Sequence, residues 1–235
     1  MYAYISHPED TERPYWIFMG RDKFENDLLI KLGYKEQNFY WFHADKYSSG
    51  HVYLKLHRDE SGIADVPKVV IQDCLQLCKS ESIQGNKLPE CKIIYTPWTN
   101  LRKSGHMSPG EVSFKSSSRC GKLMCYQRDS SVLSRLKKTK VDVVDLNKAE
   151  APFMSQQEKI DNGYLFLENL LRTAKKSKDG EYLVTYVEQN RAALIELEAL
   201  MKQRNKQAKK EQAKSKKQKL KEEEEAWLND DLSDI

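Results

Sequence analysis

The chain has 235 residues, of which 39% are hydrophobic and 31% charged, and its formal net charge is +4. This length allows one folded domain with an appendage, and an odd number of cysteines, five, does not fit the disulfide framework of a small secreted protein. Because no apolar run approaches the ~20 residues that cross a bilayer and no signal-peptide core is present, we expect a soluble protein of the cytoplasm or the nucleus.

The first predicted elements are a strand and a helix separated by a sharp turn. Residues 15–19, YWIFM, form an apolar run typical of a buried strand, and Gly20 ends it. Asp22 is placed to cap a helix that Gly33 would end. The apolar positions of this helix recur at spacings of four, one and three, which predicts one buried stripe: Phe24, Leu28, Leu29 and Leu32.

Residues 38–56 hold the densest group of functional side chains and are predicted to form two strands around a polar turn. Alternate side chains of a strand point to opposite faces of the sheet. In the second strand Val52, Leu54 and Leu56 share an apolar face, so the opposite face need not be buried. If the two strands pair, one surface presents two imidazoles, a phenol and an ammonium: His43, His51, Tyr53 and Lys55.

Two interpretations of this surface stay open. Aromatic and cationic groups on a sheet bind nucleic acid, because bases stack on the rings and phosphates pair with the cations. Alternatively, the rings fill a core and the histidines are hydrogen-bonded structural residues. The turn adds Ser48, Ser49 and Gly50, whose hydroxyls and backbone amides suit a phosphate but also occur in ordinary loops.

The middle of the chain alternates further strands and helices. Pro67 suits the first turn of a helix over residues 67–80, with these side chains facing inward: Val69, Val70, Cys74, Leu77 and Cys78. Three strands and a basic helix are predicted next, over residues 91–96, 112–114, 123–126 and 132–139. The order predicts an α+β fold, with an antiparallel or mixed sheet packed with helices and followed by C-terminal helices and a charged helical tail.

Cofactor and metal sites are not expected. Cys74 and Cys78 lie four residues apart on one face of a predicted helix, but no paired Cys or His motif supplies the remaining zinc ligands. We therefore interpret them as buried thiols. The glycine patterns that bind a nucleotide phosphate or a dinucleotide are also missing from the sequence.

After a predicted hinge around Pro152, the apolar spacing becomes helical on both sides of an Asp179–Gly180 turn. These two helices either form a hairpin on the domain or pair with a partner protein. The expected organisation is a domain over residues 1–142, a helical region over 143–201 and a charged tail over 202–235.

The tail separates its charges. Residues 202–221 contain ten Lys or Arg and one acidic residue, residues 222–235 contain seven acidic residues and no basic one, and the rest of the chain has a net charge of +2. A Lys-rich run is commonly a solvated helix; the functional alternatives are a phosphate clamp for RNA or a nuclear import signal. Trp227 and Leu228 are a candidate docking motif for a protein partner.

Several segments resemble the NFACT-R domain, the RNA-binding module of ribosome quality-control proteins. They are residues 19–27 (MGRDKFEND), 41–45 (WFHAD) and 49–52 (SGHV). Three further segments resemble the stand-alone form of this module: residues 95–98 (YTPW), 109–112 (PGEV) and 135–140 (RLKKTK). The resemblance covers about residues 1–142 and leaves the helical region and the tail unmatched.

The resemblance implies contact with tRNA or rRNA on the large ribosomal subunit, in translation quality control. The candidate RNA-binding residues combine the strand surface and its turn with cations elsewhere in the module: Lys23, Asn26, Trp41, His43, Lys46, Ser48, Ser49, His51, Tyr53, Lys55, Arg102, Lys103 and Arg135.

Two other functions are carried as alternatives. One is a hydrolase that releases aberrant peptide from tRNA, with His43 or His51 as general base, Asp45 orienting the imidazole and Lys46 steadying the oxyanion. Neighbouring residues on a strand point opposite ways, so this group converges only if the turn brings it together. The other is a scaffold that binds DNA or acidic surfaces, because basic charge attracts any polyanion.

Overall fold

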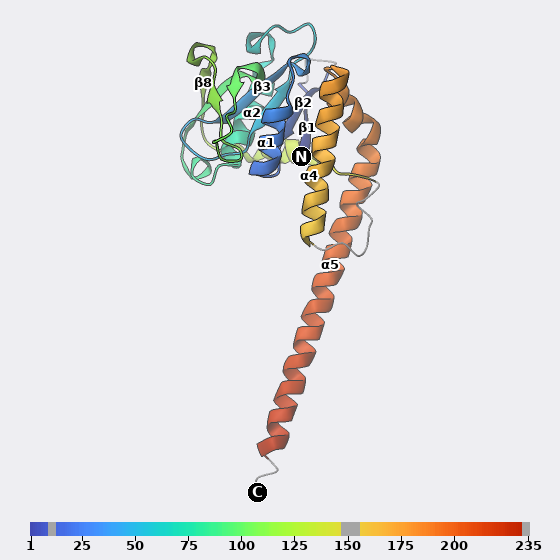
Figure 1. Cartoon of the computed structure of the whole chain (residues 1–235). Coiled ribbons are helices and arrows are strands. Elements are labelled where there is room, and N and C mark those ends of the chain that lie inside the picture. The colour runs from blue at the N-terminus through green and yellow to red at the C-terminus, as the bar shows by residue number, and fades with distance from the viewer. Residues whose placement is uncertain (9–12, 147–155, 232–235) are drawn as a thin grey trace. The chain divides into compact units, whose positions relative to one another are not determined.

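The computed structural model describes residues 1–8, 13–146 and 156–231, with the side chains of residues 156–160 and 221–231 left out. Within these residues, seven strands form one antiparallel sheet in the order β8-β5-β3-β4-β2-β1-β9 (Figure 1). In chain order they are β1 (Tyr2–Ser6), β2 (Tyr15–Met19), β3 (Phe39–Ala44), β4 (Val52–Lys55), β5 (Cys91–Pro97), β8 (Gly121–Cys125) and β9 (Val141–Asp142). A separate two-stranded ribbon pairs β6 (Leu101–Arg102) with β7 (Ser113–Phe114).

The sheet is apolar on both faces because its central strands alternate two sets of apolar side chains. β3 and β4 pair antiparallel, with Trp41 opposite Tyr53 and Phe42 opposite Val52. Trp41 and Tyr53 belong to one hydrophobic core, while Phe42 and Val52 belong to the other. Both faces therefore need cover, and an α+β fold of this kind is what the sequence predicts.

Helices cover each face. α1 (Lys23–Leu32), α4 (Gln156–Ser177) and the first turns of α5 (Tyr182–Asp231) pack on the face of Trp41, and Figure 1 shows α4 beside α1. α2 (Lys68–Ser80) and α3 (Ser130–Thr139) pack on the face of Phe42. The two helices around the Asp179–Gly180 turn thus form a hairpin on the domain.

The prediction of an open strand surface is wrong. Tyr53 is fully buried, and Lys55 and His51 are each 5% exposed. The alternation was read correctly, but the second face is covered by α4 and α5, which lie more than 100 residues further along the chain. The two predicted helix stripes also contain errors, because Phe24 and Val69 are 46% and 42% exposed.

The chain divides into two compact units, residues 1–194 and 195–235. The first contains the sheet, and the second consists of the remainder of α5. Among the described residues, none of the helices has the length and apolar character required to cross a bilayer. The predicted hinge around Pro152 and the side chains of Trp227 and Leu228 lie outside the described residues.

Gly33 ends α1 as predicted, but for a different reason. Its φ of −56° is accessible to any residue, so no left-handed turn requires glycine here. Instead, a Cβ at this position would lie 2.1 Å from Cε2 of Trp98. The missing side chain lets the indole pack against the end of the helix.

We predict that Gly33→Ala lowers the free energy of unfolding by about 1–3 kcal/mol, because the added methyl forces the Trp98 indole away. Urea unfolding followed by fluorescence measures the change. Gly105→Ala is the matched control, since a Cβ there meets no atom within 4 Å. Equal stability of the two variants would contradict the packing role.

Candidate nucleic-acid interface

A cleft of about 570 Å³ opens at the ends of β2, β3 and β4. One wall is the β2–α1 turn with Arg21 and Lys23, and another is the β3–β4 loop from His43 to His51. Residues 109–111 and Glu81 complete the lining. The cleft therefore brings together all three segments that resemble the NFACT-R domain, together with the 109–112 segment of the stand-alone form.

The β2–α1 turn is held by side-chain hydrogen bonds to its own backbone. Asp22 caps α1 as predicted, because one carboxylate oxygen accepts from the backbone N–H groups of Phe24 and Glu25 at 2.9 and 3.0 Å. Asn26, 6% exposed, accepts from the backbone N–H of Gly20 at 3.1 Å. The Asn26 amide thus orders the wall of the cleft. Asn26 is predicted to contact RNA, but its side chain is mostly buried.

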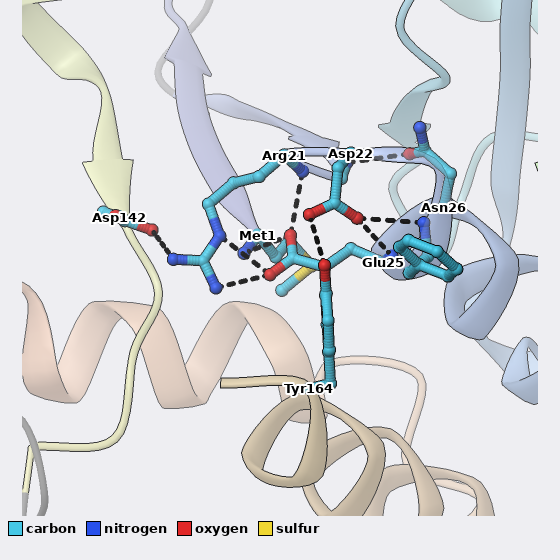
Figure 2. Close-up of polar contacts among 9 residues, drawn as sticks. Met1, Arg21, Asp22, Glu25, Asn26, Asp142 and Tyr164 are labelled. Carbon is cyan, nitrogen blue, oxygen red and sulfur yellow. Dashed lines mark hydrogen bonds and ion pairs between the residues drawn. The ribbon is translucent and has the colours of Figure 1, made fainter. Parts of the chain in front are cut away.

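Behind this turn lies a buried charge cluster, drawn in Figure 2. Oε1 of Glu25 accepts from the Arg21 guanidinium. Oε2 of Glu25 accepts from the Arg21 backbone N–H and lies 2.7 Å from the Met1 ammonium. Arg21 also reaches Asp142 of β9 at 3.5 Å, and Tyr164 of α4 donates to Asp22 at 2.8 Å. The cluster ties α4 and β9 to the β2–α1 turn.

The charge state of Glu25 follows from these neighbours. Burial alone would raise the pKa of Glu25, but the Met1 ammonium and the Arg21 guanidinium outweigh burial and hold the pKa below its ordinary value. Glu25 is therefore ionised at neutral pH even though its side chain is fully buried. Removing that charge would leave two cations without their partner.

Two rings of the cleft lining, those of His43 and His51, contact the Trp41 ring beneath them. Trp41 stacks on His43 with ring centroids 5.4 Å apart, and His43 meets His51 edge-on at 4.8 Å. The Trp41 indole N–H donates to Nδ1 of His51 at 2.9 Å. The two histidines lie on one surface, as the strand pattern predicts. Trp41 is 2% exposed and packs against them from the buried side.

Both histidines are neutral at physiological pH. Burial, aided by His43 and Lys103, lowers the pKa of His51 to about 3. Burial also lowers the pKa of His43, although a hydrogen bond with the Ala44 carbonyl opposes this shift. That carbonyl only accepts, so the 2.8 Å contact places the proton of neutral His43 on Nδ1 and leaves Nε2 as an acceptor.

The β3–β4 loop is fixed from within. The Ser49 hydroxyl accepts from the backbone N–H of Ala44 at 3.0 Å and donates to the Gly50 carbonyl at 3.1 Å. Ser49 is therefore engaged in holding the loop, whereas the predicted phosphate-binding hydroxyl of Ser48 is exposed. Lys46, next to Ser48 in the same loop, is exposed as well.

A distant loop closes the cleft through Asp27 of α1. Lys103 lies 2.6 Å from Asp27, and the backbone N–H of Gly110 donates to the same carboxylate at 3.3 Å. Lys103 also donates to the carbonyls of Ser108 and Glu111. Lys103 thus anchors the 103–111 loop, and no signal in the sequence places that loop beside α1.

The lysines and carboxylates of the cleft differ in what they contact. Asp45 pairs with Lys122 at 2.8 Å, Glu111 accepts from the backbone N–H of Ser108 at 3.0 Å, and Asp22 is the helix cap. Glu81 adds one exposed negative charge. Lys23 and Lys46 are exposed, and neither has an ion pair in the part of the chain that the structure describes.

The other predicted contact residues lie away from the cleft. Lys55 is at the opposite end of β4, where it pairs with Glu181 at 2.9 Å, and Tyr53 is sealed beneath α1 and α4. Arg135 of α3 forms two hydrogen bonds with Asp73 of α2, at 2.6 and 3.0 Å. Arg102 is exposed on β6. Burial or internal pairing makes Tyr53, Lys55 and Arg135 structural residues.

The hydrolase constellation is only partly assembled. His43, His51, Asp45 and Lys46 all line the cleft. Among the described residues, however, neither imidazole is hydrogen-bonded to a carboxylate, since Asp45 pairs with Lys122 and His51 bonds to Trp41. A general base oriented by a carboxylate is therefore not formed by these four side chains, and peptide release stays a prediction.

The cysteines are free thiols, and Cys74 and Cys78 are buried as predicted. Burial raises the pKa of both thiols. In the described ranges, no group of three or more His, Cys, Asp or Glu side chains is arranged to hold a metal ion.

Comparison with known proteins identifies the module. The family model described as the NFACT protein RNA binding domain matches residues 1–116. Protein JLP2 of Saccharomyces cerevisiae is 53% identical over 216 residues, which cover 92% of this chain and 94% of JLP2. This chain belongs to the NFACT RNA-binding domain family. The family supports an RNA-binding role, and its matched segment contains both walls of the cleft.

Other relatives within the family are shorter matches. Coiled-coil domain-containing protein 25 of Bos taurus is 42% identical over 142 residues, covering 60% of this chain and 67% of that protein. The homolog of the same protein in Dictyostelium discoideum is 37% identical over 147 residues, covering 63% and 67%. Among solved structures, the C-terminal part of the fibronectin/fibrinogen-binding protein of Streptococcus suis aligns with a TM-score of 0.45 and 21% identity, covering 59% of this chain and 48% of that one.

We predict that Glu25→Gln lowers the free energy of unfolding by about 3–5 kcal/mol, because it leaves the Arg21 guanidinium and the Met1 ammonium without their buried carboxylate. Chemical denaturation at pH 7 measures the loss. Asp59→Asn is the control, since the Arg13–Asp59 pair is exposed and should change stability little. Similar losses in the two variants would show that burial of the cluster does not matter.

We also predict that His51 makes the fold sensitive to acid. The pKa of His51 falls from 6.5 in the unfolded chain to about 3 in the fold, so the unfolded state binds more protons between these values. Stability should therefore fall as the pH drops below 6.5. His51→Asn keeps an acceptor for the Trp41 indole but does not titrate.

The measurement is urea unfolding of both proteins between pH 5 and 7.5. From pH 6.5 to 5 the wild type should lose about 2 kcal/mol more than His51→Asn. All other titrating groups are common to the two proteins. Parallel pH profiles would contradict a neutral, buried His51.

Proposed function

We propose that this protein binds tRNA or the large ribosomal subunit through the cleft, and that it acts in ribosome-associated quality control. The observation that carries the proposal is the exposure of Lys23 and Lys46, in two segments that line one cleft, without ion-pair partners among the described residues. Two cations in that position attract adjacent phosphates of an RNA strand. The RNA-binding family and the stand-alone form of the module support the same role.

The His43 side chain contributes specificity in this proposal. Phosphate contacts position a nucleic acid but carry no sequence information. His43 is half-buried, neutral and fixed with Nε2 as an acceptor, so it would receive a hydrogen bond from a ribose hydroxyl or a base N–H. The lysines would then supply affinity, and His43 would sense which group lies in the cleft.

The place of action follows from the target. Action on translating ribosomes would place the protein in the cytoplasm, and the Lys-rich tail is compatible with the nucleus as a second location. Crosslinking and sequencing of bound RNA in cells tests this part of the proposal. Recovery of tRNA and large-subunit rRNA supports quality control, whereas recovery of messenger RNA alone argues against it.

We predict that Lys23→Gln combined with Lys46→Gln weakens binding of tRNA and lowers the salt dependence of binding. Two lost phosphate contacts should reduce the slope of log affinity against log salt by about 1.4–1.8. Filter binding with the full chain measures both quantities, at salt concentrations from about 50 to 200 mM, over which phosphate contacts change the affinity strongly.

Lys68→Gln combined with Lys138→Gln is the matched control. Both lysines are exposed, and they lie on α2 and α3, which cover the opposite face of the sheet. This variant has the same net charge as the cleft variant and should retain the wild-type slope. If the two variants bind alike, the cleft is not the binding site; if duplex DNA binds as well as tRNA, RNA is not the preferred target.

A further inference from the structure

The second unit of the chain contains the C-terminal part of α5. Every side chain from residue 201 to 220 is exposed. Nine of these twenty residues are cations: Lys202, Arg204, Lys206, Lys209, Lys210, Lys214, Lys216, Lys217 and Lys219. Burial of an apolar face therefore does not explain this segment of α5.

The cations gather on one side of the helix. At 3.6 residues per turn, seven of the nine fall within an arc of roughly 160°, and we name these residues the basic face: Lys202, Lys206, Lys209, Lys210, Lys214, Lys216 and Lys217. Arg204 and Lys219 lie outside the arc. The remaining side is mostly uncharged: Asn205, Gln207, Ala208, Glu211, Gln212, Ser215 and Gln218.

The spacing within the basic face opposes helix formation. Lys202, Lys206, Lys210 and Lys214 follow one another at intervals of four, so each repels the next across one turn. The preceding turn shows the opposite arrangement, because Glu198 and Lys202 form an ion pair at 2.5 Å across the same interval. A helix selected only for solubility would continue that alternation of signs. The basic face instead presents one sign over about 22 Å of axis.

We propose that the basic face binds the phosphate backbone of an RNA duplex. The helix holds seven cations on one side along about 22 Å of its axis, and a duplex exposes its phosphates in continuous rows, so several phosphates come within reach of the basic face at once. Acidic side chains on a protein surface do not form such continuous rows, and a single RNA strand must be ordered before it can match the basic face. This inference shares the RNA ligand of the proposed function but uses different residues, so it adds a second contact that recognises duplex shape.

The test changes the face without changing the composition. In the full chain, three exchanges spread the nine cations evenly around the helix axis: K209Q with Q218K, K217A with A208K, and K219Q with Q212K. Net charge and amino-acid content stay those of the wild type. Binding to a blunt RNA duplex is measured by fluorescence anisotropy across a salt series, with circular dichroism to confirm equal helix content.

We expect the rearranged variant to bind the duplex at least about tenfold more weakly at 0.1 M salt, with a salt slope smaller by about 1.4–1.8, since two of the seven lysines leave the basic face. Amide exchange of residues 202–220 should slow when the duplex binds to the wild type, and less so in the variant. Equal affinity of wild type and variant would overturn the proposal, because only the total charge would then matter.

Further arms separate this proposal from the cleft. When the rearrangement is made in the Lys23→Gln, Lys46→Gln variant, it should weaken duplex binding as much as in the wild-type background. This holds even if the two cleft substitutions leave tRNA binding unchanged. A single-stranded RNA of the same length should respond less than the duplex. If polyglutamate shows the same loss as RNA, the basic face fits an acidic protein instead, and the proposal is wrong.

Discussion

Cover on both faces of the sheet is the constraint on which the rest of the structure depends. β3 and β4 carry Trp41 and Tyr53 on one side and Phe42 and Val52 on the other, and each set is buried beneath helices. An RNA cannot reach the flat surface of such a sheet, as it does in modules with one open face. Within the sheet domain, ligand contact is therefore confined to the rims, where strands end and loops begin. The cleft at the ends of β2, β3 and β4 is such a rim.

Buried and exposed polar residues around the cleft have different roles. Buried groups such as Glu25, Asn26 and His51 are satisfied by fixed partners and give the walls their shape. The exposed lysines in the same segments, Lys23 and Lys46, form no ion pair among the described residues, and Lys23 lies over the Phe24 ring at 5.1 Å. Because the shaping residues alternate along the chain with the exposed ones, a single short motif carries both tasks. The β2–α1 turn and the β3–β4 loop, which both resemble the NFACT-R domain, are built in this way.

Local features of the fold could be predicted from the sequence, and long-range ones could not. The apolar run at Tyr15–Met19, the Asp22 cap and the pairing of the two strands around residue 48 depend on neighbours, and the structure has all three. The exposure of Lys55 depended on what covers the second face, and the partner, Glu181, lies in α5. Phe24 has helical spacing typical of a core residue, yet α1 turns it outward. The loop that holds Lys103 against Asp27 has no sequence signal, because the contact joins positions far apart in the chain.

The tie between β4 and the C-terminal helices sets where the protein can be divided. The segment matched by the family model ends at residue 116, before β8, β9, α3 and α4. A fragment cut there would leave Lys55 buried without Glu181 and would expose Trp16, Phe18 and Leu29 to water. Such a fragment would aggregate rather than fold, because apolar surface of this extent drives association. Expression of the RNA-binding module by itself should therefore run to residue 194, where the first compact unit ends.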